Sequence, residues 1–116
     1  MGNMVEMGIS GYLAKPEGAG PWPAIIVIQE WWGLDVQTKS IADRFAALGY
    51  LAFSPDLYHG ELAQLGDGDK AMALVQKYAP GTPAELATLY DALKAHPDCT
   101  GKIGSVGFCF GGRQGA

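Results

Sequence analysis

A cysteine stands among glycines in the segment Gly107-Phe108-Cys109-Phe110-Gly111-Gly112. The segment has the form of a nucleophile elbow, a sharp turn between a strand and a helix that exposes a nucleophilic side chain. Gly107, Gly111 and Gly112 are the elbow glycines, at positions where a larger side chain would meet neighbouring backbone. The N–H groups of the following helix would lower the pKa of the thiol and stabilise an oxyanion. The segment therefore predicts nucleophilic catalysis by Cys109.

Two other interpretations of this segment stay open at the level of sequence. Cys109 could be an ordinary small buried hydrophobic residue, which is common for cysteine. The glycines could also form a phosphate-binding turn, but no lysine follows them and the spacing is not GxGxxG. A strand directly before the cysteine favours the elbow.

Three apolar runs are expected to form the strands that position this chemistry: Ala24–Ile28, Tyr50–Ser54 and Lys102–Phe108. Continuous β-branched character in the first run is typical of a strand covered on both faces of a parallel sheet. Between the first two runs, apolar residues at helical spacing, ending with Leu48, predict a helix that begins after Asp35 as its N-cap and stops at Gly49. Strand, helix and strand then form a βαβ unit, and the expected class is α/β.

The region before the third run is expected to hold two further helices. The second has the clearest start in the sequence, with Thr82 as N-cap, Pro83 in the first turn and Glu85 completing a capping box. In the loop before the first of them, His59 is the only histidine that could approach the site, although its position favours an exposed loop residue. Asp56 is interpreted as a turn former and not as a catalytic acid.

Glu30 directly follows the first predicted strand. The carboxyl ends of the strands are where open α/β folds bind ligands, so a carboxylate there is a candidate catalytic group. The alternatives are a solvated loop carboxylate or a charge that caps a helix.

Composition excludes several functional classes. With 116 residues, 48% of them hydrophobic, the chain can form one small folded domain. The net charge of −4 leaves no basic surface for nucleic acid, and no apolar run is long enough to span a bilayer. Cys99 and Cys109 make neither a disulfide framework nor a zinc site. No secretory signal is visible, which favours the cytoplasm.

The sequence resembles the dienelactone hydrolase family over essentially its whole length. The likeness rests on three segments, each after a predicted strand: Gln29-Glu30-Trp31-Trp32-Gly33-Leu34, Ser54-Pro55-Asp56-Leu57-Tyr58 and Gly107-Phe108-Cys109-Phe110-Gly111-Gly112-Arg113. The resemblance implies an α/β-hydrolase fold, with a mainly parallel sheet flanked by helices. Residues 1–116 would be the N-terminal part of one such domain, truncated after the nucleophile elbow.

The resemblance also implies roles for individual residues. The family opens ester or lactone bonds with a cysteine nucleophile, and its type member converts dienelactone to maleylacetate. Cys109 matches the nucleophile, and Glu30 matches the glutamate that contacts the resting thiol. Trp31 and Phe110 match the positions whose backbone N–H groups form the oxyanion hole. The expected partner is a small ester or lactone, with no metal or organic cofactor, no nucleic acid and no membrane.

A complete triad needs an acid and a histidine after the nucleophile, and residues 110–116 contain no Asp, Glu or His. We therefore expect this chain alone to be inactive or nearly so. It would be either a piece of a longer enzyme or a short non-catalytic relic that binds a ligand or assembles with another chain through an exposed sheet edge. The coding sequence downstream of Ala116 would separate these explanations.

Overall fold

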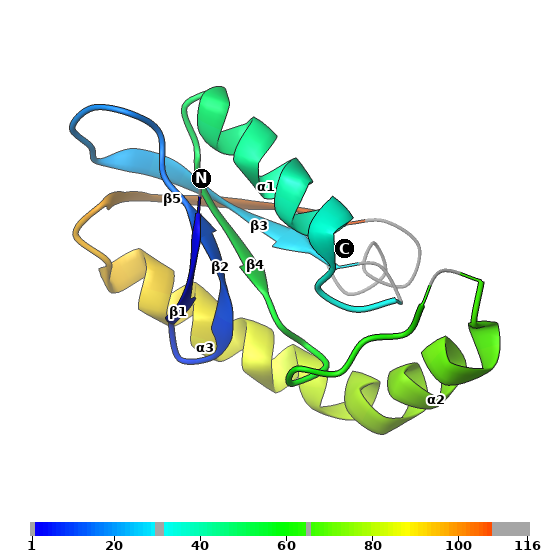
Figure 1. The fold of residues 1–116 in the computed structure, drawn as a ribbon. Coiled ribbons are helices and arrows are strands. Elements are labelled where there is room, and N and C mark those ends of the chain that lie inside the picture. Colours follow the sequence, from blue (N-terminus) through cyan, green and yellow to red (C-terminus); the bar gives the residue numbers. More distant parts are fainter. Residues whose placement is uncertain (1, 30–31, 65, 108–116) are drawn as a thin grey trace.

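The computed structural model describes residues 2–29, 32–64 and 66–107. Its strands are β1 (Asn3–Glu6), β2 (Ser10–Ala14), β3 (Trp22–Ile28), β4 (Leu51–Pro55) and β5 (Cys99–Gly107). Its helices are α1 (Val36–Ala47), α2 (Gly68–Tyr78), the short 3₁₀ turn η1 (Ala79–Gly81) and α3 (Thr82–Ala95). The strands form one sheet in the order β1-β2-β4-β3-β5, with α1 on one face and α3 on the other (Figure 1).

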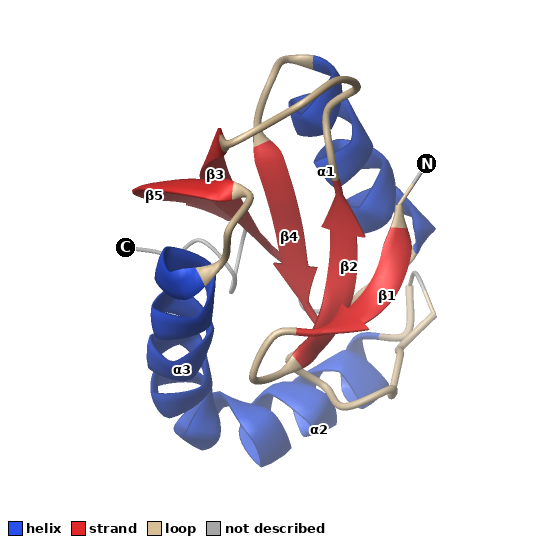
Figure 2. Cartoon of the chain, turned by 90° about the vertical axis from the view of Figure 1, so that its left-hand side faces the viewer, coloured by secondary structure: helices blue, strands red, loops and turns tan. Residues whose placement is uncertain are grey.

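The α/β-hydrolase architecture expected from the sequence is confirmed, and the sheet itself is mixed. The β4-β3-β5 part is parallel, whereas β1 and β2 form an antiparallel hairpin that also pairs antiparallel with β4. Figure 2 shows this hairpin at one margin of the sheet and β5 at the other. The expected strand Ala24–Ile28 lies in the centre as part of β3.

Both faces of β3 are covered, as its apolar composition predicts. Val27 packs with Ala42 and Ala46 of α1 on one face. Ile26 and Ile28 pack on the other face with a cluster that includes Leu74 of α2 and a pair of fully buried leucines of α3, Leu89 and Leu93. Burial on both faces fixes the register of the strand, because a one-residue slip would exchange its two apolar sets.

The start of α1 is predicted correctly, and so is its apolar face except for Leu48: Ala42 is buried, and Ile41 and Phe45 pack against the core. The Asp35 carboxylate accepts a hydrogen bond from the Thr38 N–H at 2.9 Å, and Gly49 adopts φ +101° just beyond the helix. Leu48, however, is 73% exposed. The helix ends at Ala47, so Leu48 has left the helical path and the inward position is taken by Ala46.

The capping box expected at Thr82 is absent. Thr82 is already helical because η1 leads directly into α3, and its hydroxyl donates to the Tyr78 carbonyl at 3.1 Å. The Glu85 carboxylate instead pairs with His59. Sequence alone does not reveal that the preceding turn continues into the helix and takes over the role of a cap.

The third expected strand is present as β5 but is not buried throughout. Thr100, Lys102 and Gly104 are exposed, while Cys99 is buried, and Phe108 lies outside the described residues. Within the described part of the chain, β5 pairs only with β3, so no described strand covers its other edge.

Candidate active site

Gly107 is the one predicted elbow residue that the structure describes; Cys109, Phe110, Gly111, Gly112, Glu30 and Trp31 lie outside the described residues. Gly107 ends β5 and is the parallel register partner of Ile28, which ends β3. In the sequence, Ile28 precedes Glu30 by two positions and Gly107 precedes Cys109 by two positions. The two segments with predicted catalytic residues thus follow directly from paired strand ends.

Side-chain hydrogen bonds tie the ends of β3 and β4 together. Gln29 is fully buried immediately after β3, and its Oε1 accepts from the Leu57 N–H at 3.0 Å. The Ser54 hydroxyl donates to the Val27 carbonyl at 2.6 Å. Gln29 Nε2 finds no hydrogen-bond acceptor in the described part of the chain. The sequence analysis did not single out Gln29. A single amide side chain directly after an apolar strand is the signal that could have indicated a buried hydrogen bond there.

The loop that follows β4 is folded into a tight turn around Asp56. Its Oδ2 accepts from the Gly60 N–H at 2.7 Å, and its carbonyl accepts from the His59 N–H at 3.3 Å. His59 itself has φ +53°, a left-handed conformation that costs energy for a residue with a side chain. The prediction that Asp56 is a turn former is confirmed.

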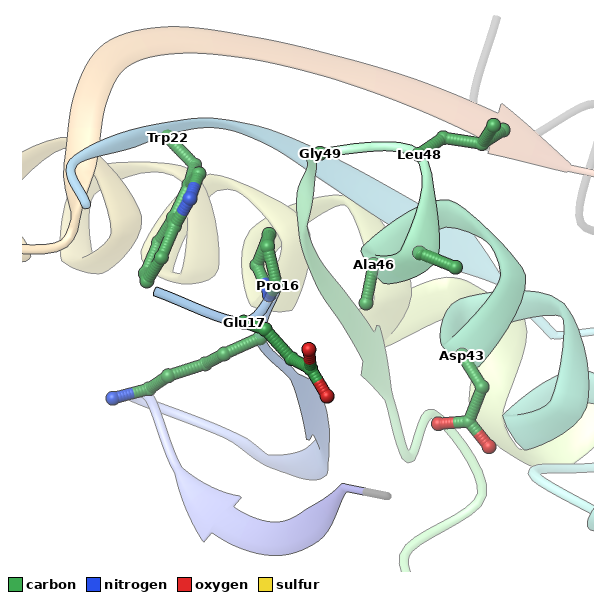
Figure 3. Close-up of a pocket in the computed structure, with 9 residues that line it drawn as sticks. Pro16, Glu17, Trp22, Asp43, Ala46, Leu48 and Gly49 are labelled. Carbon is green, nitrogen blue, oxygen red and sulfur yellow. The ribbon is translucent and has the colours of Figure 1, made fainter. Parts of the chain in front are cut away.

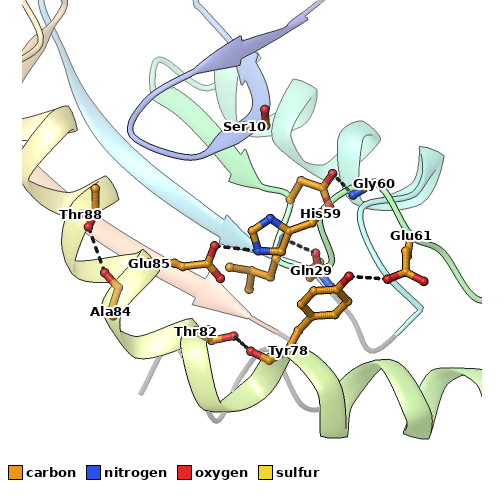
Figure 4. A network of polar contacts seen from close by, with 12 residues as sticks. Ser10, Gln29, His59, Gly60, Glu61, Tyr78, Thr82, Ala84, Glu85 and Thr88 are labelled. Atoms are coloured by element: carbon orange, nitrogen blue, oxygen red, sulfur yellow. Dashed lines mark hydrogen bonds and ion pairs between the residues drawn. The ribbon is translucent and has the colours of Figure 1, made fainter.

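His59 is a half-exposed loop residue, as expected, but it is engaged with α3. Its Nε2 lies 2.9 Å from Glu85 Oε2, and its ring lies over Tyr78, with the ring centroids 5.2 Å apart (Figure 4). This contact holds the loop against the first turn of α3. Its two members stand 26 positions apart in the sequence, which is why local patterns could not reveal it.

A second polar cluster fastens the same loop to α2. The Tyr78 hydroxyl donates to Glu61 (Figure 4). Glu61 also accepts from Lys77 Nζ at 3.0 Å. The hydrogen bond from Tyr78, together with that from Lys77, lowers the pKa of the Glu61 carboxyl. The bond to Glu61 in turn raises the pKa of the Tyr78 hydroxyl.

Tyr58 forms an aromatic stack beneath this loop. It is fully buried and lies against the Tyr78 ring, with centroids 5.7 Å apart and planes inclined by 27°. Burial raises the pKa of the Tyr58 hydroxyl to about 12, so the group stays protonated at neutral pH. Tyr58 belongs to one of the segments that indicate the family. Its burial against Tyr78 shows that it acts as a packing residue.

The loop after β3 and the loop after β4 lie directly against each other. The Ala63 N–H donates to the Trp32 carbonyl at 2.8 Å. Gly33 has φ +111°, and a Cβ built there would lie 2.7 Å from Leu62 Cδ2 and 2.9 Å from the Glu61 carbonyl oxygen. Only glycine allows this close approach. Beside the contact, at the start of α1, lies a hollow of about 840 Å³.

Another hollow, of about 520 Å³, lies at the opposite end of the parallel strands (Figure 3). Its walls are Trp22 at the start of β3, the turn at Gly49 before β4, and Glu17 of the loop between β2 and β3. It therefore opens at the amino ends of β3 and β4, away from the edge that the predicted catalytic segments follow. Among residues 2–29, 32–64 and 66–107, no group of three or more His, Cys, Asp or Glu side chains is arranged to hold a metal ion.

None of the helices in the described ranges is both long and apolar enough to cross a membrane. His96 is the C-cap of α3, and its Nδ1 accepts from the Asp98 N–H at 3.0 Å, so its contacts are those of a structural residue at a helix end.

Sequence comparison identifies similar proteins along nearly the whole chain. Protein usf of Aquifex pyrophilus is 37% identical over 97% of this chain and 52% of its own length. A protein of Aquifex aeolicus named "Putative carboxymethylenebutenolidase" is 35% identical, with the same two coverages. The chain thus spans about half the length of these curated relatives.

Comparison with solved structures gives the same result. The structure named m3DLH matches with a TM-score of 0.79 and 27% identity, over 99% of this chain and 51% of that chain. A dienelactone hydrolase-like promiscuous phosphotriesterase from metagenomic libraries matches with a TM-score of 0.78 and 26% identity, with the same coverages. The sequence profile of the Dienelactone hydrolase family matches residues 9–115, and the chain belongs to that family.

Proposed function

We propose that this chain carries the nucleophilic half of an enzyme that hydrolyses carboxylic esters or lactones through Cys109. Its membership of the dienelactone hydrolase family supports the reaction class. The single structural observation behind the assignment is the pairing of Ile28 with Gly107, two positions before Glu30 and two before Cys109 in sequence. Paired ends of parallel strands are where α/β folds gather catalytic residues.

In the proposed reaction, the thiolate of Cys109 attacks the carbonyl carbon of the ester. The backbone N–H groups of Trp31 and Phe110 would stabilise the resulting oxyanion, and Glu30 would contact the resting thiol and assist its deprotonation. The tetrahedral intermediate then expels the alcohol, which takes a proton, and leaves a thioester on Cys109. Water hydrolyses the thioester, releasing the carboxylic acid and restoring the thiol.

The general base of this cycle is not among residues 110–116, which contain no Asp, Glu or His. We therefore expect the 116-residue chain by itself to show little or no ester turnover. One of the similar structures is titled a promiscuous phosphotriesterase. A phosphotriester is likewise attacked by a nucleophile at a centre that develops an oxyanion, so this substrate class belongs in the same assay.

Thiol reactivity tests the nucleophile without requiring turnover. In the Cys99→Ala chain only Cys109 remains, and in the Cys109→Ala chain only Cys99, which is buried and accepts a hydrogen bond from the Gly101 N–H at 3.4 Å. We expect iodoacetamide to alkylate Cys109 at pH values well below about 8.5, the ordinary cysteine pKa. Alkylation of Cys109 with the pH dependence of an ordinary thiol would contradict an activated nucleophile.

An ester assay on the unaltered chain checks the second expectation. Strong turnover that disappears in Cys109→Ala would confirm the nucleophile and show that a base is already present in this chain. Turnover that survives in Cys109→Ala would count against the proposed mechanism as a whole.

A further inference from the structure

The side-chain amide of Gln29 carries an acceptor and a donor, and they differ in what they contact. Its Oε1 accepts from the Leu57 N–H at 3.0 Å. Its Nε2 is buried and finds no hydrogen-bond acceptor among residues 2–29, 32–64 and 66–107. The whole side chain is fully buried, so bulk water does not reach it. A buried amide N–H without an acceptor is unfavourable, and nearly all such groups in folded proteins have one.

The bond to Leu57 also determines where the donor lies. The oxygen and the nitrogen belong to one planar amide group, so a bond that holds Oε1 holds Nε2 as well. The nearby carbonyl of Val27 already accepts from the Ser54 hydroxyl at 2.6 Å. The exits of β3 and β4 are therefore joined through Oε1 and through Ser54, which leaves Nε2 for an acceptor on another segment.

The predicted nucleophile turn begins next to Gln29 in the register of the sheet. Gln29 follows Ile28 by one position, and Ile28 is the parallel partner of Gly107 at the end of β5. Cys109 stands two positions after Gly107 in the sequence. A sharp turn departs from strand geometry, so its carbonyl groups need acceptors' partners other than a strand ladder. A buried amide donor at the neighbouring strand end supplies such a partner.

We propose that Gln29 is a positioning residue for the nucleophile, with its Nε2 donating to a backbone carbonyl of the segment Phe108-Cys109-Phe110. This inference rests on the proposed hydrolysis for the role of Cys109, and it adds what holds that residue in place. One amide then joins the strand exits, because Oε1 holds the loop after β4 and Nε2 holds the turn after β5. A nucleophile works from one geometry, and that geometry depends on the groups that support it.

Nuclear magnetic resonance on the 116-residue chain identifies the acceptor directly. A hydrogen bond transmits a scalar coupling from the donor nitrogen to the carbonyl carbon of the acceptor, so the coupling names the accepting residue. We expect a coupling from Gln29 Nε2 to the carbonyl carbon of residue 108, 109 or 110, and slow exchange of its amide hydrogens with solvent. Gln76, which is exposed on α2, is the control and should show fast exchange without such a coupling.

The reactivity of the thiol tests whether this contact positions Cys109. In the Cys99→Ala background, Gln29→Met removes both hydrogen bonds of the amide and keeps an unbranched side chain. We expect the pH midpoint of alkylation by iodoacetamide to rise toward the ordinary cysteine value of about 8.5. A rise of one pH unit would slow alkylation about tenfold at a pH well below the midpoint, because the thiolate is the reactive form.

Ser54→Ala in the same background is the matched control. It also removes a buried hydrogen bond between the ends of β3 and β4, but it leaves the amide of Gln29 unaltered. It should lower the free energy of unfolding, measured by urea denaturation, without moving the midpoint of alkylation. An equal shift in Ser54→Ala and Gln29→Met would mean that general loosening of the strand ends changes the thiol, and it would overturn the positioning role.

The outcomes separate this inference from the proposed function. A coupling from Nε2 to a carbonyl outside residues 108–110, or no coupling at all, would overturn the inference even if Gln29→Met does not fold. A coupling into the turn of a chain whose Cys109 alkylates as an ordinary thiol would leave the contact standing and count against the proposed hydrolysis. An activated Cys109 that Gln29→Met leaves unchanged would do the reverse.

Discussion

Gln29 is an unusual residue for the end of a central strand, because its side chain is fully buried and polar. Its Oε1 satisfies the Leu57 N–H at 3.0 Å and so joins the exits of β3 and β4. Replacement by Leu would leave that buried N–H without an acceptor. We expect Gln29→Leu to lower the free energy of unfolding by about 1–3 kcal/mol, measured by urea denaturation.

Gln29→Glu tests the role of the acceptor oxygen, because a protonated carboxyl at this position can still accept the hydrogen bond from the Leu57 N–H. Its loss of stability should therefore be smaller at acidic pH than at neutral pH, where a buried charge is unfavourable. Gln76→Leu, at an exposed position of α2, is the control for the change in composition. A Gln29→Leu chain as stable as the control would show that the hydrogen bond to Leu57 contributes nothing.

Residues with local partners could be predicted from the sequence, and those with distant partners could not. Asp35 was identified as an N-cap because its partner, the Thr38 N–H, is three positions away. The partner of Gln29 is 28 positions away, and the partner of Glu85 lies on another element. Spacing within one helix is fixed by its geometry, whereas a contact between elements requires the fold.

The loop after β4 is held in place by contacts with α2 and α3. The contribution that its Glu61 carboxylate makes to the free energy of unfolding should depend on pH. The pKa of Glu61 is lowered by the hydrogen bond from Tyr78 and by Lys77. Folding therefore favours the ionised carboxyl. Its stabilising contribution is fully present above the ordinary pKa of 4.5 and is lost as the pH falls through the lowered pKa of the folded protein.

Glu61→Gln should accordingly destabilise the chain at neutral pH, with a difference from the unaltered chain that shrinks in acid. Urea denaturation at a series of pH values from about 7 down to about 3 measures that difference. Glu17→Gln, in the exposed loop between β2 and β3, controls for removal of one negative charge. A difference that stays constant across the series would mean that the carboxylate is not the stabilising species.

Helices and strands were predicted more reliably than their ends. The apolar run of β3 and the helical period of α1 persist over several residues, so tertiary contacts reinforce them. In the sequence, Pro80 and Gly81 predict a break between two helical patterns, but these residues form η1 and lead into α3. Proline is tolerated in a first helical turn, so a proline between two helical patterns does not decide between a break and a continuation.

At the scale of the whole molecule, three strand-end motifs indicate the family and the parallel strands β3, β4 and β5, whereas the sequence analysis does not predict the antiparallel hairpin. In the sequence, Ile9, Tyr12 and Leu13 form a short alternating run that overlaps β2, whereas the residues of β1 show no pattern of their own. It forms because β2 offers a free edge, which is a property of the sheet and not of residues 3–6. The candidate nucleophile and Glu30 remain predictions, supported by family membership and by the register of β3 and β5.

The outer edge of β5 is the corresponding free edge at the other margin of the described sheet (Figure 2). It runs over nine residues, and beside it lies an apolar groove of about 310 Å³ formed with Ile26, Ile28 and Leu86. A strand edge that no described strand covers, next to apolar side chains, is a template for strand addition, so the 116-residue chain should self-associate as its concentration rises. Analytical ultracentrifugation over a range of concentrations measures this association.

Gly104→Lys tests whether that edge is the surface of association. Gly104 is exposed in β5 and lines the groove, and no atom lies within 4 Å of a Cβ built there, so the side chain fits the folded monomer. A lysine at the edge should weaken association without lowering the free energy of unfolding, because glycine is itself unfavourable in a strand. Gly81→Lys adds the same charge at an equally open position in η1 and should associate as the unaltered chain does. Equal association of the two lysine variants would mean that the contact lies elsewhere on the chain. An unaltered chain that stays monomeric at every concentration would show that the edge of β5 does not promote strand addition.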